Sequence, residues 1–480
     1  MNLTVFNQKI ESLKRFEVLN EDDITRFGEI VKGLSDWDIF RINPISFAKT
    51  YSFNTNSIID IFVHSVKIGL FDFNWNLLCP MCGGIEFSLS SMNNIEGDTF
   101  HCTTCNLDVS TNIDDQVEVS FTLNQIIKEL EVDPYSNIES YFKYFFSKNY
   151  KMSNEFSKYL FNELLIDYYV VDPDESKIIS YETKPNTLYR FLSIQTHSCF
   201  YIQTGDNETN LPLAVEVDLL SSGFSPNEVS VDYGKVNFHI HNRSKYKIGM
   251  ILMKVDFSIT RNLVKLNPTQ KFDFLTGKGL LNNQSFRDLF RVQNLSRDLK
   301  LNIRSLTIMF TDLKGSTEMY DEAGDYRAYN LVQKHFDILI NSVRKYSGAI
   351  IKTMGDAIMA TFSSPNDGLL ASFDMMKNID KMNNEWEKIE GHEIGLKIGL
   401  NEGAALAVNA DERLDYFGQS VNVAARIQGL ASAGEIWVSE SIYNNFNENN
   451  FIESIGYKTE KQSAILKGVG KPTPVYKIFR

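Results

Sequence analysis

The sequence predicts a multidomain protein with a helical N-terminal segment, a mainly β middle region and a C-terminal α+β domain. Apolar residues recur at helical spacing in the first part of the chain and at every second position in the middle. From Leu301 onward, strand-like and helix-like runs alternate. At 480 residues, the chain is long enough for about two to four domains. The expected units are residues 1–78, 79–112, 113–268, 269–300 and 301–480.

The composition is that of a globular protein with an excess of acidic residues. Hydrophobic residues make up 43% of the chain, and the formal net charge is -13. This charge argues against broad binding to nucleic acid or to anionic membranes, although it leaves room for a local basic site. No long uncharged apolar run is present, so we expect no transmembrane helix, and Met1–Ile10 lacks the apolar centre of a signal peptide. A cytoplasmic location is therefore expected.

The N-terminal segment, residues 1–78, is expected to be helical. Apolar positions in Asp36–Ile45 and Ser57–Val66 recur at helical spacing. Two short helices on either side of Asn43-Pro44 would have the outline of a helix-turn-helix. A small packing module is the favoured interpretation, and DNA reading is the alternative.

Two Cys-x-x-Cys pairs follow this segment. In a cytosolic chain, such pairs indicate a zinc ribbon with four thiolate ligands rather than disulfides, and Gly83-Gly84 suits the tight turn that a ribbon needs. Acidic and polar flanks make contact with DNA or RNA the less favoured role, so we expect one structural Zn²⁺. The fifth cysteine, Cys199, is expected to be a buried small apolar residue. The zinc ligands would be Cys79, Cys82, Cys102 and Cys105.

The middle region is expected to be an antiparallel β-sandwich over residues 113–260, with a helical insert near 135–165. Apolar and polar residues alternate in Val117–Leu123, Val215–Leu219 and Val236–Ile240, with turn residues between these runs. His239 and His241 share one strand face. They could bind a metal, but solvated surface residues are the favoured interpretation unless a carboxylate or thiolate lies nearby. Residues 269–300 are polar and helix-prone, which is typical of a connector.

The C-terminal region alternates strands and helices and predicts helices packed on an antiparallel sheet. A helical stripe from Tyr329 to Val343 ends at Ser347-Gly348, and Met375, Ile379 and Met382 form part of another. Both stripes are expected to be core.

Two aspartates follow strand-like runs in this region. Leu306–Phe310 leads Asp312 into a short loop, and Ile350–Met354 leads Asp356 into a tight turn. Two carboxylates at the ends of neighbouring strands can bind two Mg²⁺ or Mn²⁺ ions, which suits an in-line displacement at phosphorus. The segment after Asp312 carries glycine and hydroxyl residues and enters a helix, so its backbone N–H groups can cradle a phosphate. The residues expected at the phosphate are Lys314, Gly315, Ser316 and Thr317, with solvation the alternative for the lysine.

Other polar residues complete this candidate site. Asn422 and Arg426 lie four apart on a predicted helix, Val421–Ala431, and can orient a ribose and stabilise charge on a reacting phosphate. Lys352 is a donor and Asp415 an acceptor, which together match the edge of adenine, although a simple surface ion pair is the alternative. Lys467 lies in a glycine-flanked turn suited to a polyphosphate. Taken one at a time, the helix pair and the lysine turn are weak signals.

These motifs, in this order over residues 301–480, resemble the catalytic domain of the class III nucleotidyl cyclases. The resemblance implies that Asp312, Leu313 and Asp356 form the metal site for two Mg²⁺ or Mn²⁺ ions. It further implies that Lys352 and Asp415 select adenine, that Asn422 and Arg426 act on the transition state, and that Lys467 meets the β- and γ-phosphates. The motifs that carry the resemblance are Phe310-Thr-Asp312, Lys352-Thr-Met-Gly-Asp356, Asp415-Tyr-Phe-Gly418, Val421-Asn-Val-Ala-Ala-Arg426 and Lys467-Gly468.

The resemblance also implies an assembly. Sites in that family form between two subunits arranged head to tail, and this chain carries every role, which implies a homodimer with two equivalent sites. Arg413 lies near the position of the family's additional phosphate-binding arginine, but its spacing differs from the usual pattern. The N-terminal half resembles a poorly characterised domain found ahead of some bacterial cyclases, which implies regulation by an effector that the sequence does not name.

The sequence therefore predicts an adenylate cyclase that converts ATP to 3′,5′-cyclic AMP and pyrophosphate. A guanylate cyclase is the first alternative, and Lys352 argues against it because guanine would favour an acidic residue there. The second alternative is a catalytically silent nucleotide-binding scaffold or a zinc-ribbon nucleic-acid binder, and the intact aspartate pair argues against a silent domain.

Overall fold

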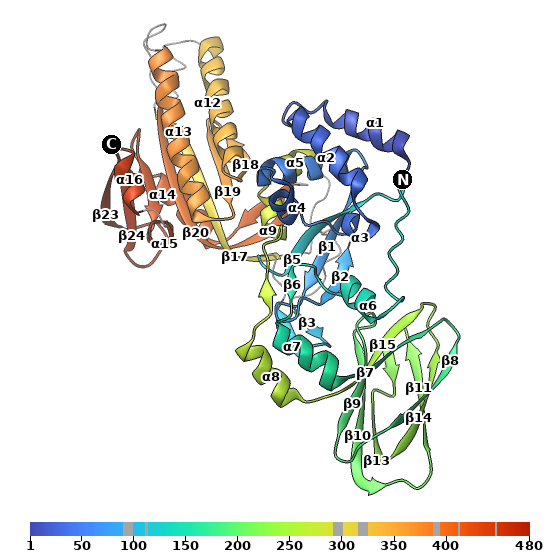
Figure 1. The fold of residues 1–480 in the computed structure, drawn as a ribbon. Coiled ribbons are helices and arrows are strands. Elements are labelled where there is room, and N and C mark those ends of the chain that lie inside the picture. The colour runs from blue at the N-terminus through green and yellow to red at the C-terminus, as the bar shows by residue number, and fades with distance from the viewer. Residues whose placement is uncertain are drawn as a thin grey trace.

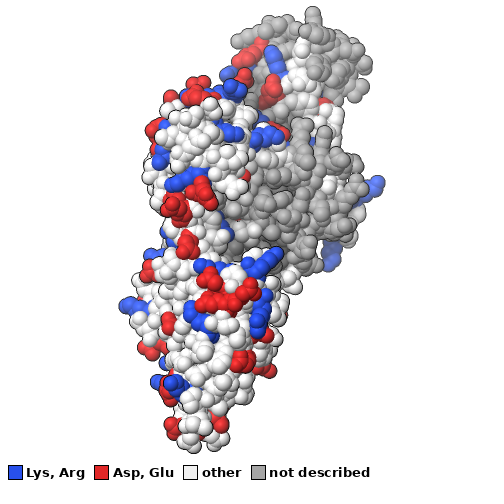
Figure 2. Space-filling model, turned by 90° about the vertical axis from the view of Figure 1, so that its right-hand side faces the viewer, with Lys and Arg blue, Asp and Glu red and all other residues white. Residues whose placement is uncertain are grey.

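The computed structural model describes residues 1–89, 99–110, 114–290, 301–314, 325–386, 394–410, 413–446 and 449–480. Figure 1 shows the C-terminal domain at one end of the molecule and a β-sandwich at the other, with the N-terminal helices and a small sheet between them. Within the described ranges, no helix has the length and apolar character needed to cross a bilayer. On the described part of the face shown in Figure 2, basic and acidic side chains are interspersed without an extended basic patch.

Five helices begin the chain, and asparagine side chains determine where four of them start. Asn2, Asn20, Asn43 and Asn54 each accept a hydrogen bond from a backbone N–H of the first helical turn. Phe47 and Phe62 lie in the buried core, so these helices form a packing module. The helices are α1 (Leu3–Leu13), α2 (Glu21–Gly33), α3 (Asp36–Ile39), α4 (Pro44–Tyr51) and α5 (Thr55–Lys67).

The expectation of helix up to residue 78 is wrong at its end. Phe71–Leu78 is the strand β1, because its apolar residues alternate and pack at period two. It is the centre of a three-stranded sheet between β2 (Ile85–Leu89) and β5 (Val117–Leu123). β5, expected in the sandwich, therefore belongs to this small sheet. A separate hairpin is formed by β3 (Thr99–Cys102) and β4 (Leu107–Ser110).

The sandwich begins at β7 and contains a five-stranded sheet, β13-β10-β9-β15-β7, and a four-stranded sheet, β12-β11-β14-β8. Both sheets contribute to one core, in which the rings of Phe191 and Phe238 lie 5.3 Å apart. The expectation of a purely antiparallel sandwich is wrong, because β10–β13 and β11–β14 pair in parallel. The chain crosses to the other sheet between the members of each pair. The strands are β7 (Leu165–Val171), β8 (Ser176–Glu182), β9 (Leu188–Ser193), β10 (Ser198–Glu208), β11 (Leu213–Leu220), β12 (Gly223–Ser225), β13 (Glu228–Tyr233), β14 (Lys235–Asn242) and β15 (Ile248–Lys254).

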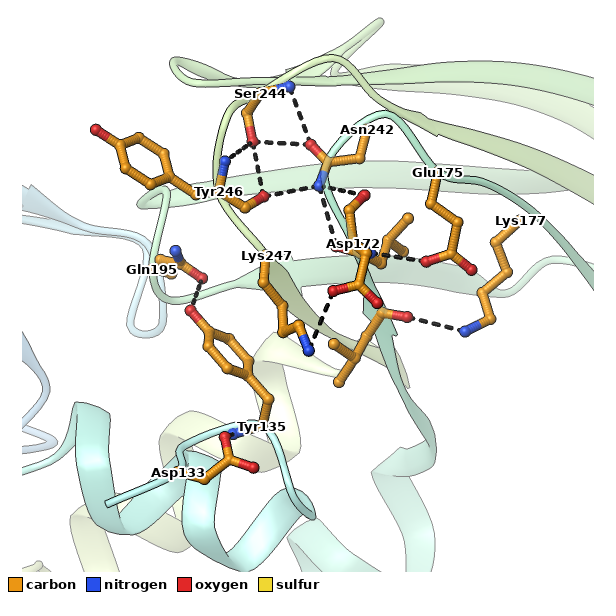
Figure 3. Close-up of polar contacts among 12 residues, drawn as sticks. Asp133, Tyr135, Asp172, Glu175, Lys177, Gln195, Asn242, Ser244, Tyr246 and Lys247 are labelled. Atoms are coloured by element: carbon orange, nitrogen blue, oxygen red, sulfur yellow. Dashed lines mark hydrogen bonds and ion pairs between the residues drawn. The ribbon is translucent and has the colours of Figure 1, made fainter. Parts of the chain in front are cut away.

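Polar contacts close one end of the sandwich (Figure 3). Asn242, at the end of β14, donates from its Nδ2 atom to three backbone oxygens at 2.8 to 3.0 Å. These oxygens belong to Val171, Asp172 and Tyr246. The Tyr135 hydroxyl donates to Oε1 of Gln195 at 2.9 Å, which ties the segment before the helical insert to the sandwich. The expected insert is confirmed as α6 (Ile138–Phe145), α7 (Asn154–Tyr159) and a π-helix at Leu160–Leu164.

The segment between the sandwich and the C-terminal domain is partly helical, as expected. Its elements are the strand β16 (Gln270–Lys271), which pairs with β6 (Tyr150–Lys151), and the helices α8 (Phe257–Leu266), α9 (Gly277–Leu281) and α10 (Gln284–Leu289). The rest of the expected connector, residues 291–300, lies outside the described ranges.

The C-terminal domain is an α+β unit around a sheet of order β18-β19-β17-β20-β22-β24-β23, with β21 paired to β20. The expected antiparallel sheet is found except at β20–β22, which is a parallel pair, so the sheet is mixed. The strands are β17 (Leu301–Lys314), β18 (Ala349–Met354), β19 (Ala357–Phe362), β20 (Gly395–Ala410), β21 (Arg413–Phe417), β22 (Ile436–Ser439), β23 (Lys458–Ala464) and β24 (Thr473–Phe479). The helices are α12 (Asp325–Lys345), α13 (Pro365–Trp386), α14 (Gln419–Gln428), α15 (Glu440–Asn445) and α16 (Asn449–Ser454).

The two faces of this sheet pack into two different cores. Met309 and Leu313 of β17 face the long helices α12 and α13, which stand up from the domain in Figure 1. Ile308 and Phe310, which alternate with them, belong to a core that extends into the N-terminal half and includes Phe286 of α10. The N-terminal half and the C-terminal domain therefore share one continuous core.

A buried histidine in α12 gives the C-terminal domain a predictable response to acid. His335 is 0% exposed, and neither ring nitrogen has a hydrogen-bond partner in the described part of the chain. Burial lowers the pKa of this imidazole from 6.5 to about 4. Because the neutral ring is favoured in the folded state, the stability it contributes is fully present above the unfolded pKa and is lost as the pH falls from 6.5 toward 4.

We expect His335→Leu to remove this part of the pH dependence. Between pH 7.5 and pH 5, the wild-type chain should lose about 2 kcal/mol of stability through this residue alone, and the variant should not. Urea unfolding of both proteins at both pH values measures the difference. An equal loss in the two proteins would contradict the assignment.

Candidate functional site

The register of the central strand brings the two aspartates together. Phe310 of β17 pairs with Met359 of β19, so Asp312, two residues further on, lies across from the β18–β19 turn that contains Asp356. Gly355 makes this turn with a φ of 65°, a conformation that suits glycine. The expectation that Asp312 lies in a loop is wrong, because β17 continues to pair with β20 as far as Lys314.

The state of the two carboxylates fits divalent cations. Oδ2 of Asp356 is buried and has no hydrogen-bond partner among the described residues. Oδ2 of Asp312 accepts a bond from Nζ of Lys397 at 2.8 Å. An orphaned buried carboxylate oxygen is costly unless a cation completes it, and oxygen ligands are those that Mg²⁺ and Mn²⁺ prefer. The Leu313 side chain is buried in the helix-side core, so only the backbone of this residue could reach a metal.

Lys352 and Asp415 meet across two strands that are distant in sequence. Nζ of Lys352 on β18 lies 2.7 Å from Oδ2 of Asp415 on β21, and the two side chains are 41% and 15% exposed. The Asp415 carboxylate is also held by the backbone N–H of Tyr416, at 2.8 Å from Oδ1. The pair therefore presents one donor and one acceptor side by side near the surface.

The helix α14 carries Asn422 and Arg426 on one side, as expected for residues four apart. Asn401 of β20 donates to the Ser420 backbone oxygen at 3.0 Å and anchors the start of this helix. At the other end, a Cβ on Gly468 would lie 3.4 Å from Nη2 of Arg426. Arg426 therefore lies against the turn that contains Lys467.

The remaining predicted residues are less informative. Lys314 ends β17 with an exposed side chain, and Gly315, Ser316 and Thr317 lie outside the described residues. Arg413 is the first residue of β21. The site residues come from three places in the domain: the β17–β19 edge, the β18–β21 pair, and α14 with the β23–β24 turn.

Lys397 and Glu216 were not predicted from the sequence. Lys397 lies across from Asp312 only because of the strand register. Glu216 on β11 contacts His239 at 2.8 Å and His241 at 2.7 Å, so these histidines do have a carboxylate beside them. The parallel pairing of β11 with β14 creates this contact. No local sequence pattern predicts that pairing.

The four cysteines of the two pairs converge. Their sulfur atoms all lie within 4.8 Å of one another, with Cys79 3.8 Å from Cys105 and Cys82 3.8 Å from Cys102. The edge of a tetrahedron with zinc–sulfur bonds of about 2.3 Å is about 3.8 Å. Gly83 has a φ of 73°, and its N–H donates to the Cys79 oxygen at 2.9 Å, which forms a tight turn around the first pair. Cys199 is buried, as expected.

Comparison with known proteins divides the chain into two parts. Residues 10–288 match the model of a family of unknown function, DUF5939, and residues 300–476 match that of the adenylate and guanylate cyclase catalytic domain. Adenylate cyclase 2 of Rhizobium meliloti is 30% identical over 154 residues, which are 30% of this chain and 42% of the relative. An adenylate cyclase of Anabaena cylindrica is 28% identical over 187 residues, which are 36% of this chain and 37% of the relative.

The chain therefore covers less than half of the length of these two relatives. Among solved structures, the adenylyl cyclase CyaB from P. aeruginosa is 23% identical and has a TM-score of 0.34. The match covers 38% of this chain and 96% of that one.

Gly399 on β20 lies where α14 packs on the sheet. A Cβ there would lie 2.2 Å from the backbone nitrogen of Gln428 and 2.3 Å from its Cα. We expect Gly399→Ala to push α14 away from the sheet and to lower the free energy of unfolding by about 3 kcal/mol. Gly470→Ala is the matched control, since nothing lies within 4 Å of its Cβ. Urea unfolding that gave the same stability for both variants would refute the close packing.

Proposed function

Because the chain belongs to the DUF5939 family of unknown function and carries an adenylate and guanylate cyclase catalytic domain at residues 300–476, we propose that the protein is an adenylate cyclase. The reaction would convert ATP to 3′,5′-cyclic AMP and pyrophosphate. The observation that carries the choice of ATP is the Lys352–Asp415 pair, with 2.7 Å between Nζ and Oδ2.

The pair suits adenine because of its hydrogen-bonding pattern. Adenine offers a ring-nitrogen acceptor beside an exocyclic amino donor, and the pair offers an ammonium donor beside a carboxylate acceptor. Asp415 is held in place by the Tyr416 N–H, so its orientation is largely set before the base arrives. A guanylate cyclase is the alternative outcome of the substrate test below.

We propose that Asp312 and Asp356 hold two divalent ions. When bound, Mg²⁺ or Mn²⁺ would supply charge neutralisation at the triphosphate and a lowered pKa at the attacking hydroxyl. Oδ2 of Asp356, which is buried and has no hydrogen-bond partner among the residues that the structure describes, supports this role. The part of residues 314–317 in binding phosphate stays a prediction.

The other polar residues would then act on the substrate. Asn422 orients the ribose, and Arg426 donates to the reacting phosphate through its fixed fork of N–H groups. The approach of Arg426 to Gly468 supports a shared role with Lys467 at the phosphates. A homodimer in which two chains form two equivalent sites is part of the proposal, because one chain carries every role.

We also propose that the N-terminal half regulates this domain. Gln284 on α10 accepts a bond from the Ile350 N–H of β18 at 2.7 Å, and Arg287 donates to the Leu414 oxygen of β21 at 2.6 Å. These are the two strands that carry Lys352 and Asp415. A displacement of α10 would therefore move both partners of the base-reading pair.

A buried polar network links the segment before α9 to the rest of the N-terminal half. Glu118 is 3% exposed and accepts bonds from Asn149, at 2.7 Å, and from Ser147, whose N–H donates to the Gly83 oxygen in the cysteine turn. Asn149 in turn accepts from Asn43, which also donates to the Asp273 oxygen at 2.8 Å. Together these bonds connect the cysteine turn to the residues that lead into α9.

We propose that Cys79, Cys82, Cys102 and Cys105 hold one structural Zn²⁺. Their sulfur spacing of 3.8 Å across two pairs supports tetrahedral coordination. Such an ion would fix the cysteine turn and, through Ser147, the position of Glu118. The effector of the N-terminal half is left open.

The test of the catalytic proposal is product formation by the purified full chain with ATP or GTP and Mn²⁺ or Mg²⁺. We expect cyclic AMP from ATP, and little product from GTP. Arg426→Ala should lower the rate by roughly 10²- to 10³-fold, and the double variant Asp312→Ala/Asp356→Ala should abolish it. Asp337→Ala, which removes an exposed carboxylate of α12, is the control. Turnover by the double variant would rule out the metal site, and a preference for GTP would favour the guanylate alternative.

The test of the regulatory proposal is Arg287→Met in the full chain. Arg287 is half-buried, and desolvation lowers the pKa of its guanidinium. Its bond to Leu414 links α10 directly to β21. Methionine keeps most of the apolar stem and removes this bond. We expect the KM for ATP to rise by about 3- to 10-fold, as loss of one charged hydrogen bond implies.

The matched control for Arg287→Met is Arg261→Met, on the exposed side of α8. Steady-state kinetics with ATP compares the two variants. If both have the kinetics of the wild-type chain, α10 does not influence the base-reading pair, and the regulatory proposal fails at this contact.

A further inference from the structure

A small polar cavity lies where the N-terminal half meets the C-terminal domain, away from the candidate catalytic site and from the four cysteines. Its volume is about 50 Å³, and its walls come from α5, from α9 and α10, and from the turn between α12 and β18. One water molecule needs roughly 10–15 Å³ of such space, so the cavity has room for a few water-sized groups. The polar residues that determine its chemistry are Asn56, Asp60, Gln284, Ser285, Arg344 and Ser347.

The carboxylate of Asp60 gives this cavity a negative group that is only partly compensated. Oδ1 of Asp60 accepts a hydrogen bond from Nδ2 of Asn283 at 2.8 Å. Asp60 is half-buried, and desolvation raises the pKa of its carboxyl, although hydrogen bonds from Asn283 and Ser285 act in the opposite direction. A desolvated carboxylate of this kind is stabilised by a positive charge placed beside it.

The other charged groups around the cavity do not supply that positive charge. Nη2 of Arg344 lies 2.7 Å from Oδ2 of Asp288, so the charge of this arginine is already paired. His64, one turn after Asp60 on α5, is 3% exposed, and burial lowers the pKa of its imidazole, so the ring is neutral near pH 7. The four groups together leave one negative charge, which is that of Asp60.

The cavity wall also presents oxygen atoms in fixed positions. Oδ1 of Asn56 accepts a hydrogen bond from the Ser347 hydroxyl at 2.9 Å. Oε1 of Gln284 accepts from the Ile350 N–H at 2.7 Å, and its Nε2 donates to Asp288 at 2.8 Å, so the amide is held at both ends. A carbonyl oxygen has two lone pairs, so both amide oxygens can still accept or coordinate a second group.

This combination of oxygens and a single charge matches a monovalent cation. Mg²⁺ requires octahedral geometry and keeps several of its water molecules, which a cavity of about 50 Å³ cannot hold. Ca²⁺ sites usually gather several carboxylates, whereas Asp60 is the one unpaired carboxylate among the described residues of this wall. Ordered water would satisfy the hydrogen bonds and leave the charge of Asp60 uncompensated.

We propose that this cavity is a regulatory site for a monovalent cation of about the size of K⁺, either the metal ion itself or the ammonium group of a small amine. The regulatory effect rests on the proposed function, and it passes through Gln284. This residue lines the cavity and also holds β18, the strand that carries Lys352. A bound cation fixes Gln284 and α10 against β18, and so strengthens the binding of ATP.

The experiment compares the full chain in the chlorides of K⁺, ammonium, methylammonium and tetramethylammonium at equal ionic strength. Tetramethylammonium is too large for the cavity and has no N–H donor, so it is the reference. We expect K⁺ and ammonium to raise the midpoint of urea unfolding and to lower the KM for ATP about fivefold, a typical coupling between two sites. A response to methylammonium as strong as that to ammonium would identify an amine as the ligand, and its absence would identify the bare ion.

Two variants test whether the response comes from this cavity. Asp60→Asn removes the charge at nearly constant size, and Asn56→Leu removes a wall oxygen at nearly constant size from a half-exposed position, where folding is least affected. We expect both variants to behave alike in K⁺ and in tetramethylammonium. Asp337→Asn, which changes an exposed carboxylate of α12, is the matched control and should keep the wild-type response.

The outcomes separate this inference from the proposed function. Equal unfolding of the wild-type chain in K⁺ and tetramethylammonium, or a response that persists in both variants, would overturn the cation site. Stabilisation by K⁺ without a change in KM would overturn its regulatory role. If K⁺ stabilises the chain through Asp60 but no cyclic nucleotide forms, the cation site stands and the proposed function fails.

Discussion

The antiparallel pairing of β17 with β20 is the interaction on which the rest of the C-terminal domain depends. β17 is the only described strand that touches both β19 and β20, so its register sets the position of Asp312 relative to Asp356 on one side and Lys397 on the other. A slip of one residue would turn Asp312 toward the long helices. Met309 and Phe310 point into separate cores, so such a slip would be costly. The packing of these two cores therefore fixes the register that positions Asp312.

The same strand also connects the candidate site to the N-terminal half. One face of β17 packs on α12 and α13, and the other packs on the N-terminal half through residues such as Phe286. The site residues Asp312 and Lys352 lie on this second face or at its rim. In the proposed homodimer, a second catalytic domain that approached this face would have to share it with the N-terminal half, and this is how the proposed regulation would reach the site.

Local patterns in the sequence are sufficient to predict the motifs. They are not sufficient to predict which other residues the fold places beside those motifs. The Cys-x-x-Cys pairs, the Asp356 turn and the α14 helix follow from spacing alone, and the α+β plan follows from the alternation of periods. β1 was missed because its alternating aromatic residues directly follow a helix of similar composition. The loop predicted at Asp312 is wrong because the end of a strand depends on its partner strand. Here the partner residue, Lys397 of β20, lies 85 residues further along the chain. Lys397 and Glu216 reach their partners only through pairing between strands that are distant in the sequence. No local sequence pattern predicts such pairing.

The charges at the site explain why it should respond to a whole nucleotide rather than to its parts. In the structure, Asp415 on β21 is neutralised by Lys352 on β18, and Asp312 by Lys397 on the adjacent strand β20. Oδ2 of Asp356 has no hydrogen-bond partner in the described part of the chain. Under the proposed function, a metal ion alone would have to compete with Lys397 for Asp312. A base alone can engage Lys352 and Asp415 but leaves the aspartate pair unchanged. Under the proposed function, a metal-bound nucleoside triphosphate would replace both ion pairs at once, with the base at one and the phosphates at the other. Selectivity would then arise from two resting contacts that only the complete substrate can exchange.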